Sequence, residues 1–267
     1  MNLFSLKNKT AIVTGACGLL GQQHCIALAE AGANVIVADI DQQKASALAA
    51  ELNGNHLGLS VNVTSKASLN QAKEIILEKY SQIDILVNNA AVNDMFENPE
   101  LSGFYSRFEN YPLDSWTKSL EVNVTGVFLA SQVFGSVMAE AGKGSIINIA
   151  STYGVIGPDQ SIYVEPGKEQ QFFKSPAYPA TKGAIVNFTK YLAAYWGKNG
   201  VRVNTLSPGG VENGQEDWFI KNYSQKTLLN RMAQPQDYKG ALVYLASEAS
   251  SYMTGGNLIV DGGWTAI

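Results

Sequence analysis

The 267-residue sequence predicts an α/β fold, a single domain in which helices cover both faces of a doubly wound parallel sheet. Short apolar runs alternate with longer segments of helical periodicity along the whole chain. A glycine-rich turn follows the first apolar run, and neither repeats nor linker-like composition interrupt the alternation. Because 46% of the residues are hydrophobic and 16% are charged, the chain can bury one large core, and we expect one domain over residues 1–267.

The first half of the chain predicts strands and helices in strict alternation. Residues 11–13 are an apolar run that ends at the glycine-rich turn, so they predict the first strand. Residues 19–31 have helical periodicity and stop before Gly32, a residue type that commonly follows a helix. Further apolar runs predict strands at 35–38, 57–61 and 83–87, and the segments between them predict helices at 42–52 and 68–80.

The second half continues the same order. It predicts a helix over about 115–139, a strand at 145–149, a helix that carries Tyr178 and Lys182, a strand at 201–206, a helix near 235–247 and a strand at 258–260. Successive strands joined by helices are parallel, and the connections are right-handed. Ligands of such sheets bind at the carboxyl ends of the strands, so we expect the site there.

The turn after the first strand contains Gly15, Gly18 and Gly21. Glycines let the chain turn tightly and bring backbone N–H groups and a helix N-terminus against a pyrophosphate. Asp39 ends the second predicted strand, where its carboxylate can accept hydrogen bonds from ribose hydroxyls and repel a 2′-phosphate. This predicts NAD as the cofactor, although an aspartate that caps an ordinary turn would leave the same pattern.

Tyr178 and Lys182 are four positions apart in a segment of helical periodicity, so both side chains lie on one helix face. A neighbouring ammonium lowers the pKa of a phenol toward the range useful for general acid/base catalysis. The hydroxyl of Ser151 could hold the oxygen of a carbonyl or alcohol substrate. The alternative is that Tyr178 and Lys182 form a solvated helix face.

These motifs resemble those of the classical short-chain dehydrogenase/reductases over nearly the whole chain. The matching runs are residues 14–21, Asn88-Asn89-Ala90, Asn123, Ser151, Tyr178 with Lys182, and Ser207-Pro208-Gly209. The resemblance implies a Rossmann-type sheet and a dimer or tetramer. Residues 151–154, 158–159, 161–163 and 257–265 further resemble a bacterial branch associated with nonulosonic (legionaminic-type) sugar and flagellin-glycan pathways.

The resemblance also assigns roles to residues. It implies a catalytic set of Asn123, Ser151, Tyr178 and Lys182, with Asn123 holding a water that links Lys182 to solvent. It implies cofactor contacts from Gly15, Cys17, Gly18, Leu19, Leu20, Asp39, Ile40, Asn62, Val63, Asn89, Ala90, Ala91, Tyr178, Lys182, Pro208, Gly209 and Val211. The chain departs from the family pattern where Leu19 replaces a glycine, Asn62 an aspartate, Ala91 a glycine and Asn213 a threonine.

Three segments near 93–114, 158–176 and 209–234 interrupt the alternation, and we expect them to be loops over the site. The interval of 27 positions from Ser151 to Tyr178 is longer than is usual in the family. Polar side chains in these loops, among them Asn93, Asp94 and Glu97, suit a hydroxyl-rich carbohydrate substrate. A solvated or disordered surface loop would explain the same composition.

Bulk composition excludes several functions. The net charge of −4 and the absence of a Lys/Arg run argue against nucleic acid as a partner. The sequence begins without a signal-like segment and has no apolar run of about 18 residues, so we expect no membrane partner and a cytoplasmic protein. Two cysteines and two histidines without ligand spacing predict no metal site. Aromatic residues on several faces of the Tyr178 helix indicate burial or a shared interface.

The sequence therefore predicts an NAD(H)-dependent enzyme that interconverts a secondary alcohol and a ketone, on a sugar or sugar derivative of surface-glycan biosynthesis. A 3-ketoacyl-carrier-protein reductase-like enzyme is an alternative, but it would favour NADPH and a shorter interval before Tyr178. A non-catalytic dinucleotide-sensing protein is another, and the intact Ser/Tyr/Lys/Asn set argues against it.

Overall fold

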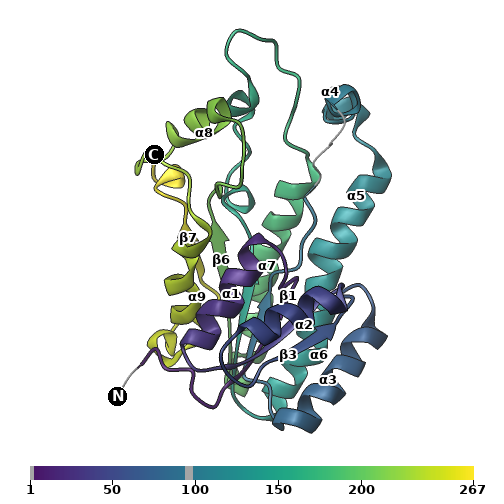
Figure 1. The fold of residues 1–267 in the computed structure, drawn as a ribbon, viewed down its shortest axis with the longest axis vertical. Helices are drawn as coiled ribbons and strands as arrows, with labels where there is room; N and C mark the ends of the chain where they lie inside the picture. The colour runs from purple at the N-terminus through teal and green to yellow at the C-terminus, as the bar shows by residue number, and fades with distance from the viewer. Residues whose placement is uncertain (1–2, 94–98) are drawn as a thin grey trace.

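The computed structural model describes residues 3–93 and 99–267, and in them seven parallel strands form one sheet with helices around it (Figure 1). The strand order is β3-β2-β1-β4-β5-β6-β7. The strands are β1 (Thr10–Thr14), β2 (Asn34–Asp39), β3 (Leu57–Ser60), β4 (Ile85–Asn88), β5 (Gly144–Ile149), β6 (Val201–Pro208) and β7 (Asn257–Val260). The α-helices are α1 (Leu19–Glu30), α2 (Gln42–Glu51), α3 (Lys66–Tyr80), α4 (Pro99–Tyr105), α5 (Leu113–Leu120), α6 (Gly126–Glu140), α7 (Ala177–Trp196), α8 (Asp217–Ser224) and α9 (Lys239–Ala246).

Each face of the sheet has its own apolar core. On one face Ile12, Ile36 and Leu86 pack with side chains of α3, α6 and α7. On the other face Val13 and Val37, the next residues along their strands, pack with α1, α2 and α9. Successive side chains of a strand point to opposite faces of the sheet, so neighbouring residues are buried in different cores. Strands buried on both faces read as continuous apolar runs, which is why the sequence predicts them.

The turn after β1 lies where the strand order reverses, between β2 on one side and β4 on the other. The hydroxyl oxygen of Thr14 accepts hydrogen bonds from the backbone N–H groups of Asn89 and Ala90. The side-chain amide of Asn89 donates to the carbonyl oxygens of Thr14 and Gly15, the latter at 2.8 Å. The end of β4 therefore fixes the glycine turn at the switch point, the usual ligand position in such sheets.

Two of the segments expected to be loops contain α-helices, and this part of the prediction is wrong. Helix α4 lies within 93–114 and α8 lies within 209–234. The 158–176 segment contains only a short 3-10 helix, Gln160–Tyr163, and rises between α8 and α4 at the top of Figure 1. Asp94 and Glu97 lie outside the described residues.

The predicted helix over 115–139 exists as α5, a π-helical turn at Glu121–Thr125, and α6. By length and composition alone, residues Leu113–Glu140 could cross a membrane. Half of the most apolar 18-residue stretch of this segment is buried, and α6 packs against β4, β5 and α3. Core helices of globular proteins share this length and composition, so these two properties alone are weak evidence for a membrane segment.

Candidate active site

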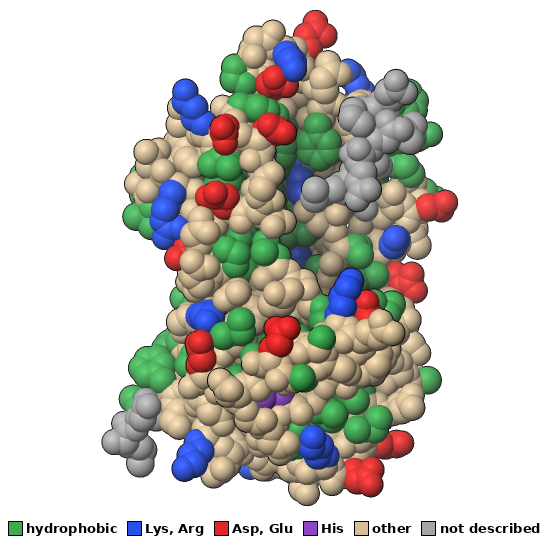
Figure 2. Space-filling view, in the orientation of Figure 1, with side chains coloured by type: hydrophobic (Ala, Val, Ile, Leu, Met, Phe, Trp, Pro, Cys, Tyr) green, Lys and Arg blue, Asp and Glu red, His purple; other side chains and the backbone are tan. Residues whose placement is uncertain are grey.

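Two cavities adjoin at the carboxyl ends of the strands. One, of about 600 Å³, lies between the glycine turn and the ends of β2, β3 and β4. The other, of about 340 Å³, lies over the ends of β5 and β6 and the start of α7. Both are lined by Leu19, Leu20, Asn89 and Ala91, so they form one continuous cleft. Figure 2 shows a hollow beneath the projecting 158–176 segment, with hydrophobic and basic side chains inside it.

The glycine turn has the shape of a pyrophosphate cradle. Gly15 has a φ of +60°, and a Cβ there would lie 2.6 Å from the Cα of Ala90. A Cβ on Gly21 would collide with the carbonyl oxygen of Gly15 and lie 2.8 Å from the Cα of Ala16. Helix α1 begins after Gly18, so the N–H groups of its first turn have no intrahelical acceptor and can bind an anion. Leu19, which stands where the family pattern has a glycine, is 41% exposed and lines both cavities.

The carboxylate of Asp39 ends β2 at the other side of the same cavity. It accepts a hydrogen bond from the backbone N–H of Cys17 at 2.9 Å and a longer one from Asp41 at 3.3 Å. Burial and the nearby Asp39 carboxylate raise the pKa of the Cys17 thiol to about 11, so this thiol stays protonated at neutral pH. Two lysines also line the cavity, Lys44 and Lys118. Lys44 forms an ion pair with Asp41 at 3.5 Å.

Ser151, Tyr178 and Lys182 converge in the second cavity. Ser151 follows β5, and its hydroxyl hydrogen-bonds to the phenol of Tyr178. Lys182, one turn further along α7, is buried and lies with its Nζ 5.6 Å from the centre of the Tyr178 ring. Its ammonium donates to the carbonyl oxygen of Ile149 at 2.8 Å. The sheet end thus fixes the lysine, and the helical spacing places the phenol beside it.

The pKa of Tyr178 moves in the opposite direction from the sequence-based expectation. Burial raises the pKa of this half-buried phenol, and the hydrogen bond from Ser151 offsets only part of the effect. Burial also lowers the pKa of Lys182 to about 8. The expectation considered the charge of Lys182 but not the loss of water around both groups. In this state Tyr178 is a neutral phenol that can donate a proton.

Asn123 is buried in the π-helical turn and does not line either cavity. Its side-chain oxygen accepts from the backbone N–H of Val92 at 2.8 Å, and its amide donates to the carbonyl oxygen of Val92 at 2.9 Å. The amide also lies 3.2 Å from the hydroxyl of Thr181 on α7. Asn123 therefore joins the chain after β4 to the helix that carries Tyr178 and Lys182.

The sequence places Tyr153 and Tyr163 near the substrate, but it missed other parts of the cavity wall on that side. The hydroxyls of Tyr153 and Tyr163 are 3.3 Å apart, and burial raises the pKa of both phenols, that of Tyr163 to about 12. Lys174 of the 158–176 segment also faces Tyr178. Other lining residues without a sequence signal are Thr152, Gln215, Phe219, Tyr223 and Met232. Lys174 had no usable signal either, because it precedes α7 and helical spacing does not apply to it.

Comparison with known proteins shows the family. Residues 15–265 match the family described as enoyl-(acyl carrier protein) reductase. The chain is 36% identical over 270 residues to a D-threitol dehydrogenase from Mycolicibacterium smegmatis, covering 98% of this chain and 95% of the relative. The chain belongs to the short-chain dehydrogenase/reductase family.

Other members of the short-chain dehydrogenase/reductase family span the chain equally well. A 3-alpha-(or 20-beta)-hydroxysteroid dehydrogenase from Mycobacterium bovis is 35% identical, covering 98% of this chain and 91% of the relative. An NAD-dependent glycerol dehydrogenase from Listeria innocua is 32% identical, covering 98% and 96%. The crystal structure of a gluconate 5-dehydrogenase from Burkholderia cenocepacia J2315 with NADP and tartrate has a TM-score of 0.87 at 28% identity, covering 100% of this chain and 98% of that chain.

Membership of this family confirms the Rossmann-type fold and an oxidoreductase activity. The comparisons do not show the nonulosonic branch. Every predicted cofactor residue lines one of the two cavities: Gly15, Cys17, Gly18, Asp39, Ile40, Asn62, Val63 and Ala90 the first, Tyr178, Lys182, Pro208, Gly209 and Val211 the second, and Leu19, Leu20, Asn89 and Ala91 both.

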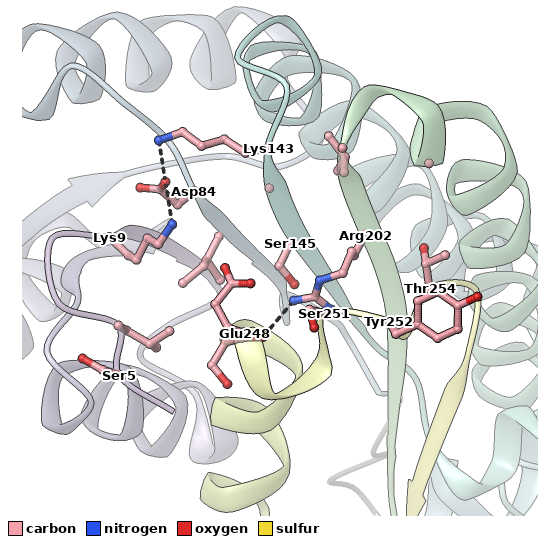
Figure 3. Close-up of a pocket in the computed structure, with 18 residues that line it drawn as sticks. Ser5, Lys9, Asp84, Lys143, Ser145, Arg202, Glu248, Ser251, Tyr252 and Thr254 are labelled. Carbon is pink, nitrogen blue, oxygen red and sulfur yellow. Dashed lines mark hydrogen bonds and ion pairs between the residues drawn. The ribbon is translucent and has the colours of Figure 1, made fainter. Parts of the chain in front are cut away.

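Another cavity of about 600 Å³ lies at the opposite, amino-terminal edge of the sheet (Figure 3). There Lys9 and Lys143 point toward the buried carboxylate of Asp84 from two sides, each at 3.6 Å. Arg202 donates to backbone carbonyl oxygens of Leu245 and Ser247. This cavity shares no lining residue with the cleft that contains Tyr178, although it is as large as the cavity at the glycine turn. Cavity size alone therefore does not identify the active site.

Proposed function

We propose that this chain is an NAD(H)-dependent dehydrogenase that interconverts a secondary alcohol and a ketone on a small hydroxyl-rich substrate, a sugar or sugar derivative. The convergence of Ser151, Tyr178 and Lys182 where the two cavities adjoin carries the proposal. The D-threitol and glycerol dehydrogenases among the relatives act on polyols, which supports this substrate class. The placement of the substrate in surface-glycan biosynthesis remains a prediction that rests on short sequence runs.

Proton transfer in this proposal belongs to Tyr178. In ketone reduction the neutral phenol donates its proton to the developing alkoxide, and in alcohol oxidation the phenolate accepts one. The hydroxyl of Ser151 holds the same substrate oxygen and hydrogen-bonds to the phenol. Lys182 favours the phenolate through its charge, and Asn123 holds α7 against the chain after β4. A bound nicotinamide dinucleotide supplies the hydride acceptor or donor.

The proposed cofactor is NAD rather than NADP. Asp39 places a negative charge at the end of β2, where the adenosine ribose of a dinucleotide lies in such folds. The NAD-dependent glycerol dehydrogenase supports NAD, whereas the gluconate 5-dehydrogenase structure contains NADP. Lys44 and Lys118 also line this cavity, and they are the described residues that could offset the charge of Asp39.

A substrate panel tests the proposal. Purified protein with NAD⁺ should form NADH with polyols and sugars faster than with simple secondary alcohols, hydroxysteroids or 3-hydroxyacyl thioesters. A preference for a hydroxysteroid or a thioester would reject the carbohydrate class. If no alcohol gave NADH or NADPH while the dinucleotide still bound, the protein would be a dinucleotide-sensing protein and not a dehydrogenase.

We also propose a homo-oligomer in the cytoplasm. Helices α6 and α7 expose an aromatic surface that contains Phe128, Tyr191 and Tyr195, which are 44%, 60% and 64% exposed. The rings of Tyr191 and Tyr195 stack at 6.0 Å beside a groove of about 300 Å³. Exposed apolar surface of this kind is common at contacts between subunits. Light scattering should give a dimer or tetramer, and a monomer would contradict this proposal.

A further inference from the structure

Tyr153 and Tyr163 form a second pair of hydroxyls in the substrate cavity. Their phenol oxygens lie 3.3 Å apart, and both side chains line the cavity that contains Ser151 and Tyr178. Tyr153 follows Ser151 by two positions, and its backbone N–H donates to the Ser151 hydroxyl at 3.2 Å. Tyr163 ends the 3-10 helix of the 158–176 segment. The end of β5 and the inserted segment therefore meet at this pair.

Aromatic contacts fix the positions of both phenol rings. The centre of the Tyr163 ring lies 5.4 Å from that of Phe172 and 5.4 Å from that of Phe219 on α8. The ring of Tyr153 meets Trp264 edge to face, with the ring centres 6.4 Å apart. Rings held in this way lose little further freedom when a ligand binds, because their conformation is already set. The hydroxyl pair is therefore a pre-formed part of the cavity wall.

The hydroxyls of Tyr153 and Tyr163 have hydrogen-bonding capacity beyond their mutual contact. Each phenol carries one proton, and the contact between the two oxygens uses only one of the two protons. Burial raises the pKa of both phenols, so both keep their protons at neutral pH. In the part of the chain that the structure describes, no other group hydrogen-bonds to either hydroxyl. One O–H and several oxygen lone pairs therefore remain for a ligand.

The phenol pair lies close to the position of the reacting oxygen. A negative charge on Tyr178 would raise the pKa of both Tyr153 and Tyr163, so the three phenols share one small space. In the proposed function, Ser151 and Tyr178 hold the oxygen of the alcohol that is oxidised. A hydroxyl both donates and accepts hydrogen bonds, as a phenol does, whereas a hydrogen atom in its place would leave the phenols unpaired. The cavity therefore suits a substrate with a second hydroxyl near the one that reacts.

We propose that Tyr153 and Tyr163 bind a second hydroxyl of the substrate, so that the preferred substrates are diols and not isolated alcohols. The inference rests on the proposed function, because the second hydroxyl belongs to the same alcohol whose proton Tyr178 accepts. Ser151 and Tyr178 contact the reacting oxygen, and the phenol pair selects the alcohol and orients it. Selectivity for diols is thereby assigned in part to the 158–176 segment, through Tyr163.

Matched substrates test the proposal, each pair differing by one hydroxyl: propane-1,2-diol with propan-2-ol, and cyclohexane-1,2-diol with cyclohexanol. We expect wild-type kcat/KM to be at least about tenfold higher for each diol, because the alcohol without the second hydroxyl leaves the phenols unpaired. The double variant Tyr153→Phe/Tyr163→Phe removes both hydroxyls but keeps both rings. It should bring each ratio to within about threefold of one, mainly through KM. Tyr252→Phe is the control and should keep the wild-type ratios, because Tyr252 is fully exposed and lies outside this cavity.

A double variant that keeps the wild-type preference for diols would overturn the proposal and leave the proposed function intact. Equal wild-type kcat/KM for both members of each pair would overturn it too. If no alcohol is oxidised, the proposed function fails, and calorimetric titration with cyclohexane-1,2-diol in the presence of NAD⁺ tests the phenol pair alone. Diol binding that is lost in the double variant but kept in Tyr252→Phe still supports the site. No binding to wild type, or equal binding to the double variant, rejects it.

Discussion

Removing the charge of Asp39 should change which dinucleotide the protein prefers. Asp39 lies at the edge of the cofactor cavity and is only partly buried, so water screens its charge. A carboxylate and a dianionic 2′-phosphate about 5 Å apart in a water-like dielectric repel each other by about 1.7 kcal/mol, or roughly 15-fold in affinity. We therefore expect wild type to bind NADH at least about tenfold more tightly than NADPH.

Two substitutions separate the charge of Asp39 from its hydrogen bond to the backbone N–H of Cys17. Asp39→Asn removes the charge but keeps an acceptor oxygen, so NADPH binding should tighten while NADH binding changes little. Asp39→Ala also removes the 2.9 Å hydrogen bond that holds the glycine turn. Because such a bond to a charged acceptor contributes about 1.5 to 3 kcal/mol, both dinucleotides should bind about tenfold or more weakly than in Asp39→Asn.

Equilibrium titration of protein fluorescence with NADH and NADPH measures both affinities without a known substrate. Lys44→Met serves as a control, because Lys44 lines the same cavity but pairs with Asp41. It should leave NADH binding unchanged. Equal or tighter binding of NADPH by wild type would refute the role of Asp39, and a further loss of NADPH binding in Lys44→Met would then assign the 2′-phosphate to Lys44.

Tyr178→Phe should keep dinucleotide binding and lower turnover roughly 100-fold or more, whereas Tyr153→Phe should change mainly KM. A near-normal kcat of Tyr178→Phe would contradict the proposed proton transfer by Tyr178. Gly21→Ala should weaken NADH binding, because the added Cβ would collide with the glycine turn. Gly18→Ala should be tolerated, because its Cβ would meet only a carbonyl oxygen at 3.4 Å. Equal NADH affinities of the two variants would refute the role of the turn in binding the dinucleotide. His24 is buried, and burial lowers its pKa to about 4. The neutral ring is therefore compatible with the fold above about pH 6.5, and the free energy of unfolding falls as the pH drops toward 4, because the unfolded chain takes up the proton first. Urea unfolding should show wild type losing about 2 kcal/mol more than His24→Leu between about pH 7.5 and about pH 5, and parallel curves would contradict this.

The sheet and the grouping of Ser151, Tyr178 and Lys182 could be predicted because both follow from local patterns. Strands such as β1 and β2 are buried on both faces, so their sequences are continuous apolar runs. Tyr178 and Lys182 share one helix, where a separation of four positions fixes their proximity. Ser151 follows β5 directly, and the carboxyl ends of parallel strands lie at one edge of the sheet.

The remaining features depend on contacts between distant parts of the chain. Helix α8 has only eight residues, too few to be stable alone, and it buries Tyr223 against Trp264, 41 positions away. Side chains of α8 also line the cleft that contains Tyr178, and burial is the largest influence on the pKa of that phenol. Lys174 precedes α7, which begins at Ala177, so helical periodicity could not place its side chain.

The two lysines around Tyr178 are held by different parts of the fold. Lys182 is held by a carbonyl oxygen at the end of β5, so its position depends on the sheet. Lys174 is held by Gln160, and through the 3-10 helix by α8, so its position depends on segments outside the alternating strands and helices. A change in the 158–176 segment can therefore move Lys174 without moving Lys182 or Ser151. It follows that variation in this segment should alter which alcohol is oxidised more than the rate of proton transfer.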